Sequence, residues 1–379
     1  MFPKLMIPGP VDIDEEILLE MSHPMTAHYG TEWMKVFDGV RDKLKRIIGT
    51  KGDLFLIVGS GHAGLDAVIG NVVEEDDKVI NIVNGYFGNR CAEITELHGA
   101  KSIRIESQWG ESVDLEKLIQ TIQKEDRIKL ITVVHNETST GVLNPVKNIS
   151  QIAKKHGIPI FVDAVSSIGA SEFRMDEWGI DFCTTASQKG LGAPPGIAII
   201  CISEEGWNVI KRRKKPYRGW YFNLLLMKEL NDKGKGIQPY GITMAVNNVR
   251  ALNKAAELIL DEGIYRRIKR HNEVARDLRK WLKKLGLEIL AKENCESNTV
   301  TVIKCNDNFK YEEVSDYLFN KHNIQVARGN SILKGKVVRI GHMGVTANYD
   351  YITYLIYSIA DFLLSKGVNV QEQLRLFFK

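Results

Sequence analysis

The sequence predicts an α/β protein with a mostly parallel sheet, followed by a smaller α+β domain. Apolar runs of strand length alternate with helical stretches between residues 53 and 203. Short buried strands joined by helices are typical of parallel sheets that helices cover on both faces. After Gly263 two amphipathic helices flank short strands instead. We therefore expect an N-terminal arm over residues 1–20, a large domain over 21–260 and a small C-terminal domain over 261–379.

The expected elements follow from local patterns. Pro3, Pro8 and Pro10 disfavour a helix, so we expect the arm to be extended. Helical spacing of apolar residues predicts helices over 32–49, 65–73, 89–99, 148–157, 243–261 and 350–365. Strands are expected at 53–58, 78–83, 129–135, 158–164, 181–187, 196–203, 298–305 and 336–342. The aromatic and glycine-rich segment over 211–241 is expected to be a loop.

Composition excludes several classes of protein. The net charge of +4 comes from 51 basic and 47 acidic residues, with no stripe of basic and aromatic side chains, so we expect no nucleic-acid partner. No apolar run approaches the roughly 20 residues of a membrane helix, so no membrane partner is expected either. The N-terminus has no signal-peptide pattern. The five cysteines form no C-x-x-C pair, which predicts no metal site and favours reduced thiols in the cytoplasm.

A glycine-rich turn joins the strand at 53–58 to the helix after it. Gly59, Gly61 and Gly64 match the G-x-G-x-x-G pattern of dinucleotide sites. Such a site also needs an acidic residue at the end of the next strand, and here that strand ends in Asn84-Gly85. The N–H groups at the helix start still form an anion cradle, to which Ser60 adds a hydroxyl. These residues alone leave two interpretations open, a phosphate site and a glycine-rich connection without a ligand.

Asp163 and Lys189 follow two later strands, whose carboxyl ends are where α/β sheets bind ligands. A desolvated lysine has a lowered pKa and attacks carbonyl carbons. A carboxylate that faces the nitrogen of a pyridine ring keeps that nitrogen protonated, as pyridoxal phosphate (PLP) chemistry requires. Taken singly, the two residues read as a turn aspartate and a solvated lysine. Their order behind a phosphate-type turn favours a PLP site.

At these residues the chain resembles the class V aminotransferases of PLP fold type I, above all the alanine–glyoxylate and serine–pyruvate aminotransferase group. The resemblance runs from Pro8-Gly9-Pro10 to KVVRIGHMG and is carried by GSGHAGLDA, NGYFGNR, HNETSTGV and VDAVSSIG with SQKGLGAPPG. It implies a seven-stranded sheet and amino transfer from alanine or serine to glyoxylate or pyruvate. It also implies a homodimer, which we expect for a second reason, since the arm has little to pack on in its own subunit.

The resemblance implies a role for each matching residue. Lys189 would form the Schiff base with PLP and move the Cα proton, and Asp163 would pair with the pyridinium nitrogen. Phe87 would stack on the ring, and Thr138 would lie near the ring hydroxyl. The other implied roles are phosphate binding by Ser60, Gly61, His62 and Gln188, phosphate binding across the subunit interface by Tyr240 and Thr243, and substrate binding by Arg339 and Gly9.

The chain departs from the family pattern at two positions. His28-Tyr29 stands where many relatives carry His-Arg near the substrate entrance, which bears on amino-acid preference, and Phe87 stands where many carry Trp. Two alternatives stay open. One is another PLP reaction, such as that of a cysteine desulfurase or lyase, although Gln188 precedes the lysine where desulfurases usually have His. The other is a non-catalytic nucleotide-binding protein built on the glycine turn.

Overall fold

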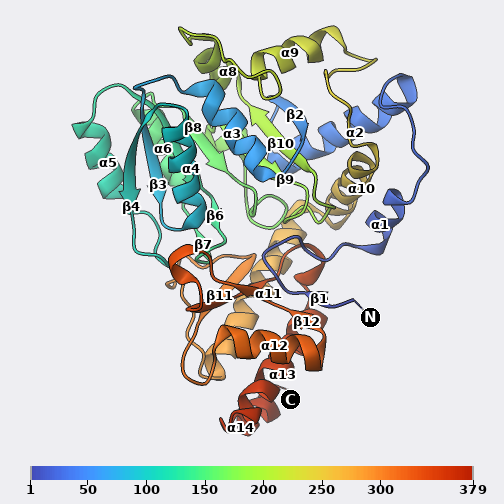
Figure 1. The fold of residues 1–379 in the computed structure, drawn as a ribbon, viewed down its shortest axis with the longest axis vertical. Coiled ribbons are helices and arrows are strands. Elements are labelled where there is room, and N and C mark those ends of the chain that lie inside the picture. Colours follow the sequence, from blue (N-terminus) through green and yellow to red (C-terminus); the bar gives the residue numbers. More distant parts are fainter. Residues whose placement is uncertain (1, 378–379) are drawn as a thin grey trace.

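The computed structural model describes residues 2–377 and builds them around a seven-stranded sheet (Figure 1). The strand order is β2-β10-β9-β8-β5-β3-β4, and β10 alone runs antiparallel to its neighbours in this sheet. The prediction of a mostly parallel seven-stranded sheet is confirmed. Its strands are β2 (Asp53–Val58), β3 (Lys78–Val83), β4 (Lys101–Glu106), β5 (Ile128–Val134), β8 (Ile160–Asp163), β9 (Phe182–Ala186) and β10 (Ile197–Ile202).

Alternate residues of the strands enter two separate cores, one on each face of the sheet. In β2, Leu54 and Leu56 belong to the first core, and Phe55 and Ile57 to the second. The first core is covered by α2 (Thr31–Ile48), α5 (Leu115–Lys124), α6 (Val146–Lys155), α7 (Met175–Trp178) and α10 (Val246–Glu262). The second is covered by α3 (Gly61–Val72), α4 (Tyr86–Leu97), α8 (Glu204–Lys211) and α9 (Leu224–Lys233). Burial on both faces explains the continuous apolar strands.

Residues after Gly263 build most of a third core, which Met6 of the arm also enters. The helices and strands of these residues lie below the large sheet in Figure 1. A three-stranded antiparallel sheet runs in the order β11-β14-β13. Its strands are β11 (Val300–Lys304), β13 (Ala327–Arg328) and β14 (Val337–Gly341), and the helices are α11 (Ile264–Lys284), α12 (Tyr311–His322), α13 (Tyr349–Ser365) and α14 (Gln371–Phe377). No helix within residues 2–377 has both the length and the apolar character needed to cross a bilayer.

The N-terminal arm packs against its own chain. Strand β1 (Lys4–Leu5) pairs with β12 (Ile324–Gln325), and Met6 and Val11 are buried. Helix α1 (Glu15–Met21) lies against α10 and is capped by Asp14, whose carboxylate accepts the Glu16 N–H at 3.0 Å. The expectations of an extended arm up to residue 20, and of little for it to pack on in its own subunit, are therefore wrong. The prolines limit only the part of the arm before α1.

Several observed elements are absent from the predicted set, among them α1, α5, α8, β4 and α9. Strand β4 lies at the edge of the sheet and alternates polar with apolar residues, so its apolar content is too low to stand out. Helix α9 lies within the segment expected to be a loop. Asn223 caps it by accepting the Leu226 N–H at 3.1 Å, and the helix buries Leu224 against the second core. Both elements are held by tertiary packing that a local pattern does not record.

Candidate active site

Asp163 and Lys189 lie at the carboxyl edge of the sheet, on neighbouring strands. Asp163 ends β8, and Lys189 lies just after β9. Burial raises the pKa of Asp163 to about 7, against the opposing effects of the Val165 N–H, which donates at 2.9 Å, and of the Lys189 charge. Burial also lowers the pKa of Lys189 to about 8, and the charge of Arg339 contributes. The two groups attract each other, but desolvation outweighs this attraction in both.

The turn before α3 leaves a helix N-terminus open to an anion. Ser60 is the N-cap residue, its side chain makes no capping hydrogen bond, and the first turn of α3 carries no acidic residue. Among the described residues the N–H groups of Gly61 and His62 meet no acceptor, whereas the Ala63 N–H donates to the Ser60 carbonyl at 2.9 Å, and the helix dipole favours negative charge at this end. Ser60 and His62 are exposed beside it, whereas Gly61 is buried.

Close packing explains two of the glycines in this turn. A Cβ on Gly61 would lie 2.8 Å from Cγ2 of Val165, and one on Gly64 would lie 1.9 Å from Oγ1 of Thr184. Because neither residue has a side chain, α3 begins directly against β9 and the loop after β8. The phosphate-type turn and the loop that follows Asp163 are thereby brought into contact.

Phe87 lies in the first turn of α4, with its ring centroid 6.2 Å from that of His62. Glu137 fixes this helix start, since its Oε2 accepts the N–H groups of Phe87 and Gly88, both at 3.0 Å. Its Oε1 accepts the Ser139 N–H at 3.0 Å and the Ser139 hydroxyl at 2.5 Å. Sequence reasoning missed Glu137. The available signal was an acidic residue inside HNETSTG, between a buried strand and a turn.

A hydrogen bond joins Thr138, which follows β6 (Asn136–Glu137), to Arg339 in β14 of the small sheet. Thr138 lies between β6 and β7 (Val142–Leu143), and its carbonyl accepts Nη1 of Arg339 at 3.4 Å. Nε of Arg339 donates to the Arg328 carbonyl at 2.7 Å and Nη2 to Oδ1 of Asn330 at 3.0 Å. Burial lowers the pKa of Arg339 to about 10, against the negative charge of Glu137. Sequence reasoning did not single out Asn330, which helps to orient this guanidinium.

The arm passes directly over the lysine. Nζ of Lys189 donates to the Pro8 carbonyl, and the Gln188 carbonyl accepts the Val11 N–H at 3.3 Å. Gly9 has a φ of +108°, and a Cβ on it would lie 2.6 Å from both Cδ and Nζ of Lys189. Oε1 of Gln188 is buried without a hydrogen-bond partner among the described residues. Gly9 therefore borders the Lys189 side chain.

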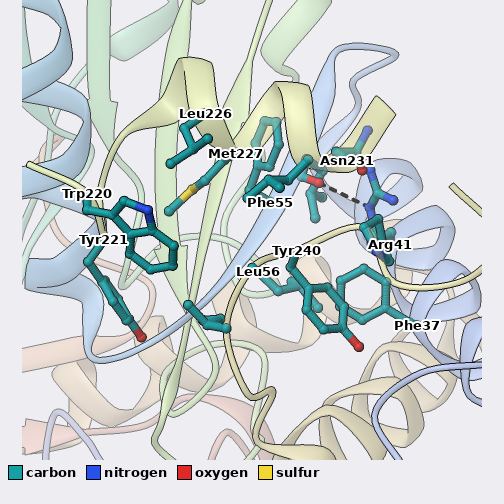
Figure 2. Close-up of a pocket in the computed structure, with 15 residues that line it drawn as sticks. Phe37, Arg41, Phe55, Leu56, Trp220, Tyr221, Leu226, Met227, Asn231 and Tyr240 are labelled. Atoms are coloured by element: carbon teal, nitrogen blue, oxygen red, sulfur yellow. Dashed lines mark hydrogen bonds between the residues drawn. The ribbon is translucent and has the colours of Figure 1, made fainter. Parts of the chain in front are cut away.

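Tyr240 and Thr243 lie in the segment between α9 and α10. The Tyr240 hydroxyl donates to the His28 carbonyl and accepts the indole N–H of Trp33, and its ring centroid is 4.9 Å from that of Phe37. Figure 2 shows Tyr240 beside Phe37, lining an apolar pocket to which Trp220 also contributes. Thr243 is exposed. Within one chain the contacts of Tyr240 are made with α2 and the loop before it, and not with the Ser60 turn.

The site fits PLP, the cofactor that the resemblance implies. It offers an open helix N-terminus at Ser60 for a phosphate, an aromatic face at Phe87 and a lysine amine of lowered pKa. Burial holds the pKa of Asp163 at about 7, so its carboxylate would gain from a cationic partner such as a pyridinium nitrogen. Oε1 of Gln188, the residue before Lys189 in the chain, is buried without a hydrogen-bond partner among the described residues and is free to bind a donor.

Comparison with known proteins leads to the same family. The family model described as aminotransferase class-V matches residues 18–347. An aminotransferase of Methanocaldococcus jannaschii, described as uncharacterized, is 41% identical over 93% of this chain and 90% of its own. The serine–glyoxylate aminotransferase of Hyphomicrobium methylovorum is 31% identical over 90% of this chain and 85% of its own. The crystal structure of ureidoglycine–glyoxylate aminotransferase from Bacillus subtilis has a TM-score of 0.93 at 30% identity, covering 100% of this chain and 97% of that one. The chain belongs to the class-V aminotransferases and is a PLP-dependent transaminase.

Proposed function

We propose that this transaminase moves the amino group of a small amino acid, alanine or serine, to glyoxylate or pyruvate. The observation that carries the catalytic assignment is the place of Lys189, half-buried at the carboxyl edge of the sheet just after β9, with Asp163 at the end of the neighbouring strand β8 and its amine bonded to the Pro8 carbonyl of the arm. The Hyphomicrobium methylovorum and Bacillus subtilis relatives described above both carry glyoxylate in their names, which supports glyoxylate as the acceptor. The name of the Hyphomicrobium methylovorum enzyme also includes serine, which supports serine as the donor.

The roles of the catalytic side chains follow from their chemistry. When bound, PLP supplies a protonated ring that stabilises negative charge on the Cα of the amino acid. Asp163 holds the proton on the ring nitrogen, and the guanidinium of Arg339 pairs with the substrate carboxylate. Lys189 is the residue that would hold the cofactor covalently, through its amine. The neutral Nζ of Lys189 would accept the Cα proton of the amino acid and hold it for the transfer that completes amino-group removal, and it would carry a proton in the opposite direction for the 2-oxo acid.

The same proposal assigns the binding residues. Phe87 stacks on the ring, and Thr138 lies near the ring hydroxyl. Gly9 lines the substrate site beside Lys189. The residues assigned to the phosphate are Ser60, Gly61, His62 and Gln188 of one subunit, with Tyr240 and Thr243 across a subunit interface.

A panel of donors and acceptors tests the reaction. Alanine, serine, aspartate and ureidoglycine are each paired with glyoxylate and with pyruvate, and the 2-oxo acid product is measured. We expect the highest turnover with alanine or serine and glyoxylate. Lys189→Ala is expected to lose turnover and the visible absorbance of the covalent adduct, while Lys211→Ala, at an exposed position, keeps both. Full activity in Lys189→Ala contradicts the assignment, and release of sulfide from cysteine in place of amino transfer favours the desulfurase alternative.

The proposal includes a homodimer in the cytoplasm, with the arm at 1–20, the large domain at 21–260 and the small domain at 261–379. The dimer is supported by the exposed apolar side chains of Trp220 and Ile237, which are 59% and 67% exposed near Tyr240. The location is supported by the five cysteines, all of them free. Sedimentation equilibrium of the native protein and of Thr243→Ala, with cofactor affinity measured for each, tests the dimer. A fully active monomer contradicts it.

A further inference from the structure

The loops that carry the two catalytic groups touch through their backbones. We call residues 164–171, after Asp163, the aspartate loop, and residues 187–192, around Lys189, the lysine loop. A Cβ on Gly169 would lie 2.7 Å from the Gly190 carbonyl oxygen, and one on Gly190 would lie 2.3 Å from the Ile168 carbonyl oxygen. With no side chain between the loops, their carbonyl groups need a donor supplied from elsewhere.

Arg267 supplies that donor from α11. Its Nε donates to the Gly169 carbonyl at 2.7 Å and its Nη2 to the Gly190 carbonyl at 3.0 Å. One planar guanidinium therefore bonds the aspartate loop and the lysine loop at once. The side chain is 9% exposed, and its third nitrogen, Nη1, donates to Oε2 of Glu262 at 2.9 Å.

Glu262 extends the connection towards the substrate arginine. Arg270 donates to both carboxylate oxygens of Glu262, at 2.7 and 2.9 Å, and through Nη1 to the carbonyls of Gly344 and Ala347. Those two carbonyls lie soon after β14, the strand that carries Arg339. Burial raises the pKa of Glu262, but the hydrogen bond and charges of Arg270 and Arg267 outweigh it, so the pKa is lowered and the carboxylate stays ionised.

We propose that Arg267 is a positioning residue for the transaminase reaction, because its fork of donors sets the distance between Lys189 and Asp163. The inference rests on the catalytic roles proposed above. A guanidinium bonds two carbonyls in fixed geometry, whereas an ammonium is a point charge on a flexible stem and does not reproduce that fork. Arg267 touches neither catalytic side chain among its hydrogen bonds and acts through the two loop backbones.

A neighbouring cavity allows a direct chemical test. A cavity of about 340 Å³ is lined by Arg267, Gly192 and Asp12, among others. Removing the Arg267 side chain enlarges this space, so added guanidinium ions have a route to the Gly169 and Gly190 carbonyls. Arg267→Ala and Arg267→Lys are compared with Arg266→Ala, the matched control on the exposed side of the same helix. The readouts are kcat, KM, the PLP dissociation constant of the cofactor-free protein, and the thermal midpoint.

In Arg267→Ala we expect kcat to fall and the PLP dissociation constant to rise, each by about 10- to 100-fold, as when hydrogen bonds to a charged group are lost. Guanidinium chloride at millimolar concentration should restore part of the lost kcat and part of the lost PLP affinity, and ammonium chloride should restore neither. Arg267→Lys should keep the thermal midpoint of the wild type and still show a lower kcat. This variant therefore tests the positioning role even if Arg267→Ala does not fold. Arg266→Ala should match the wild type.

Three results overturn the inference in distinguishable ways. If Lys189→Ala is inactive while the Arg267 variants keep wild-type kcat and PLP affinity, the proposed function stands and the positioning role of Arg267 fails. If Lys189→Ala keeps full turnover, the catalytic assignment fails and the inference fails with it. If ammonium restores the kcat and PLP affinity of Arg267→Ala to the same extent as guanidinium does, the role of the planar fork is refuted.

Discussion

Glu137 holds Phe87 through a 3.0 Å hydrogen bond from the Phe87 backbone N–H to its Oε2, across 50 residues of sequence. The carboxylate is fully buried, and burial raises its pKa against four hydrogen bonds that favour the ionised form. A negative group at a helix N-terminus is favourable, and this one sets where α4 begins. The position of the aromatic face that we assign to the cofactor ring thus depends on Glu137.

Replacing Glu137 by Gln tests this dependence. An amide NH₂ would face either the Phe87 and Gly88 N–H groups or the Ser139 N–H, so donors would lose their acceptor at a cost of about 1–3 kcal/mol. We expect weaker PLP binding and altered visible circular dichroism of the bound cofactor. The control is Glu96→Gln on the same helix, which removes only a surface ion pair with Arg104. Unchanged cofactor affinity in Glu137→Gln would refute the dependence.

The lowered pKa of Lys189 predicts the pH dependence of cofactor capture. The neutral amine is the reactive form, and with a pKa of about 8 it dominates above pH 8 instead of above the ordinary 10.5. Mixing cofactor-free protein with PLP should therefore give a capture rate that falls about tenfold per pH unit below 8 and levels off above it. The rate is measured by stopped-flow absorbance, with Lys189→Arg as the control. A rate that keeps climbing to pH 10 would show that Lys189 is not desolvated.

Asp163→Asn should separate cofactor capture from catalysis. The amide keeps the shape but not the negative charge, so we expect turnover to fall on the order of 100- to 1000-fold while the adduct with Lys189 still forms. Asp181→Asn is the matched control. Asp181 accepts the Ile160 N–H at 2.9 Å at the opposite edge of the sheet, and burial raises its pKa to about 6. Equal losses of turnover in both variants would indicate a structural role for Asp163.

Gly64→Ala should destabilise the protein, and Gly39→Ala should stabilise it. A Cβ at position 64 would meet Thr184 Oγ1 at 1.9 Å, so α3 must move off β9, and such overpacking costs roughly 1–3 kcal/mol. At Gly39, inside α2, the nearest atom is Oδ1 of Asn253 at 3.8 Å, and alanine should add roughly 0.5–1 kcal/mol. Urea unfolding gives both values. Equal effects at the two positions would contradict the packing explanation.

Gly9→Ala should impair the lysine. The new methyl group would lie within 2.6 Å of Lys189 Nζ, at a φ of +108°. Gly335→Ala is the control for backbone strain, since its φ is +73° and a Cβ there meets nothing within 4 Å. We expect slower PLP capture in Gly9→Ala and no change in Gly335→Ala. The prediction fails if the two variants capture PLP at the same rate.

The sequence by itself determined the alternation of strands and helices, and it placed Asp163 and Lys189 at the carboxyl edge of the sheet. Both follow from local patterns, because a strand buried on two faces must be apolar along its length. Tertiary structure alone decided that the arm packs on its own chain, that Glu137 holds Phe87, and that Arg267 joins Gly169 to Gly190. A local pattern shows which residues are buried but not which distant groups they meet. Buried polar groups must find hydrogen-bond partners, and those partners come from chain segments that only the completed fold brings together.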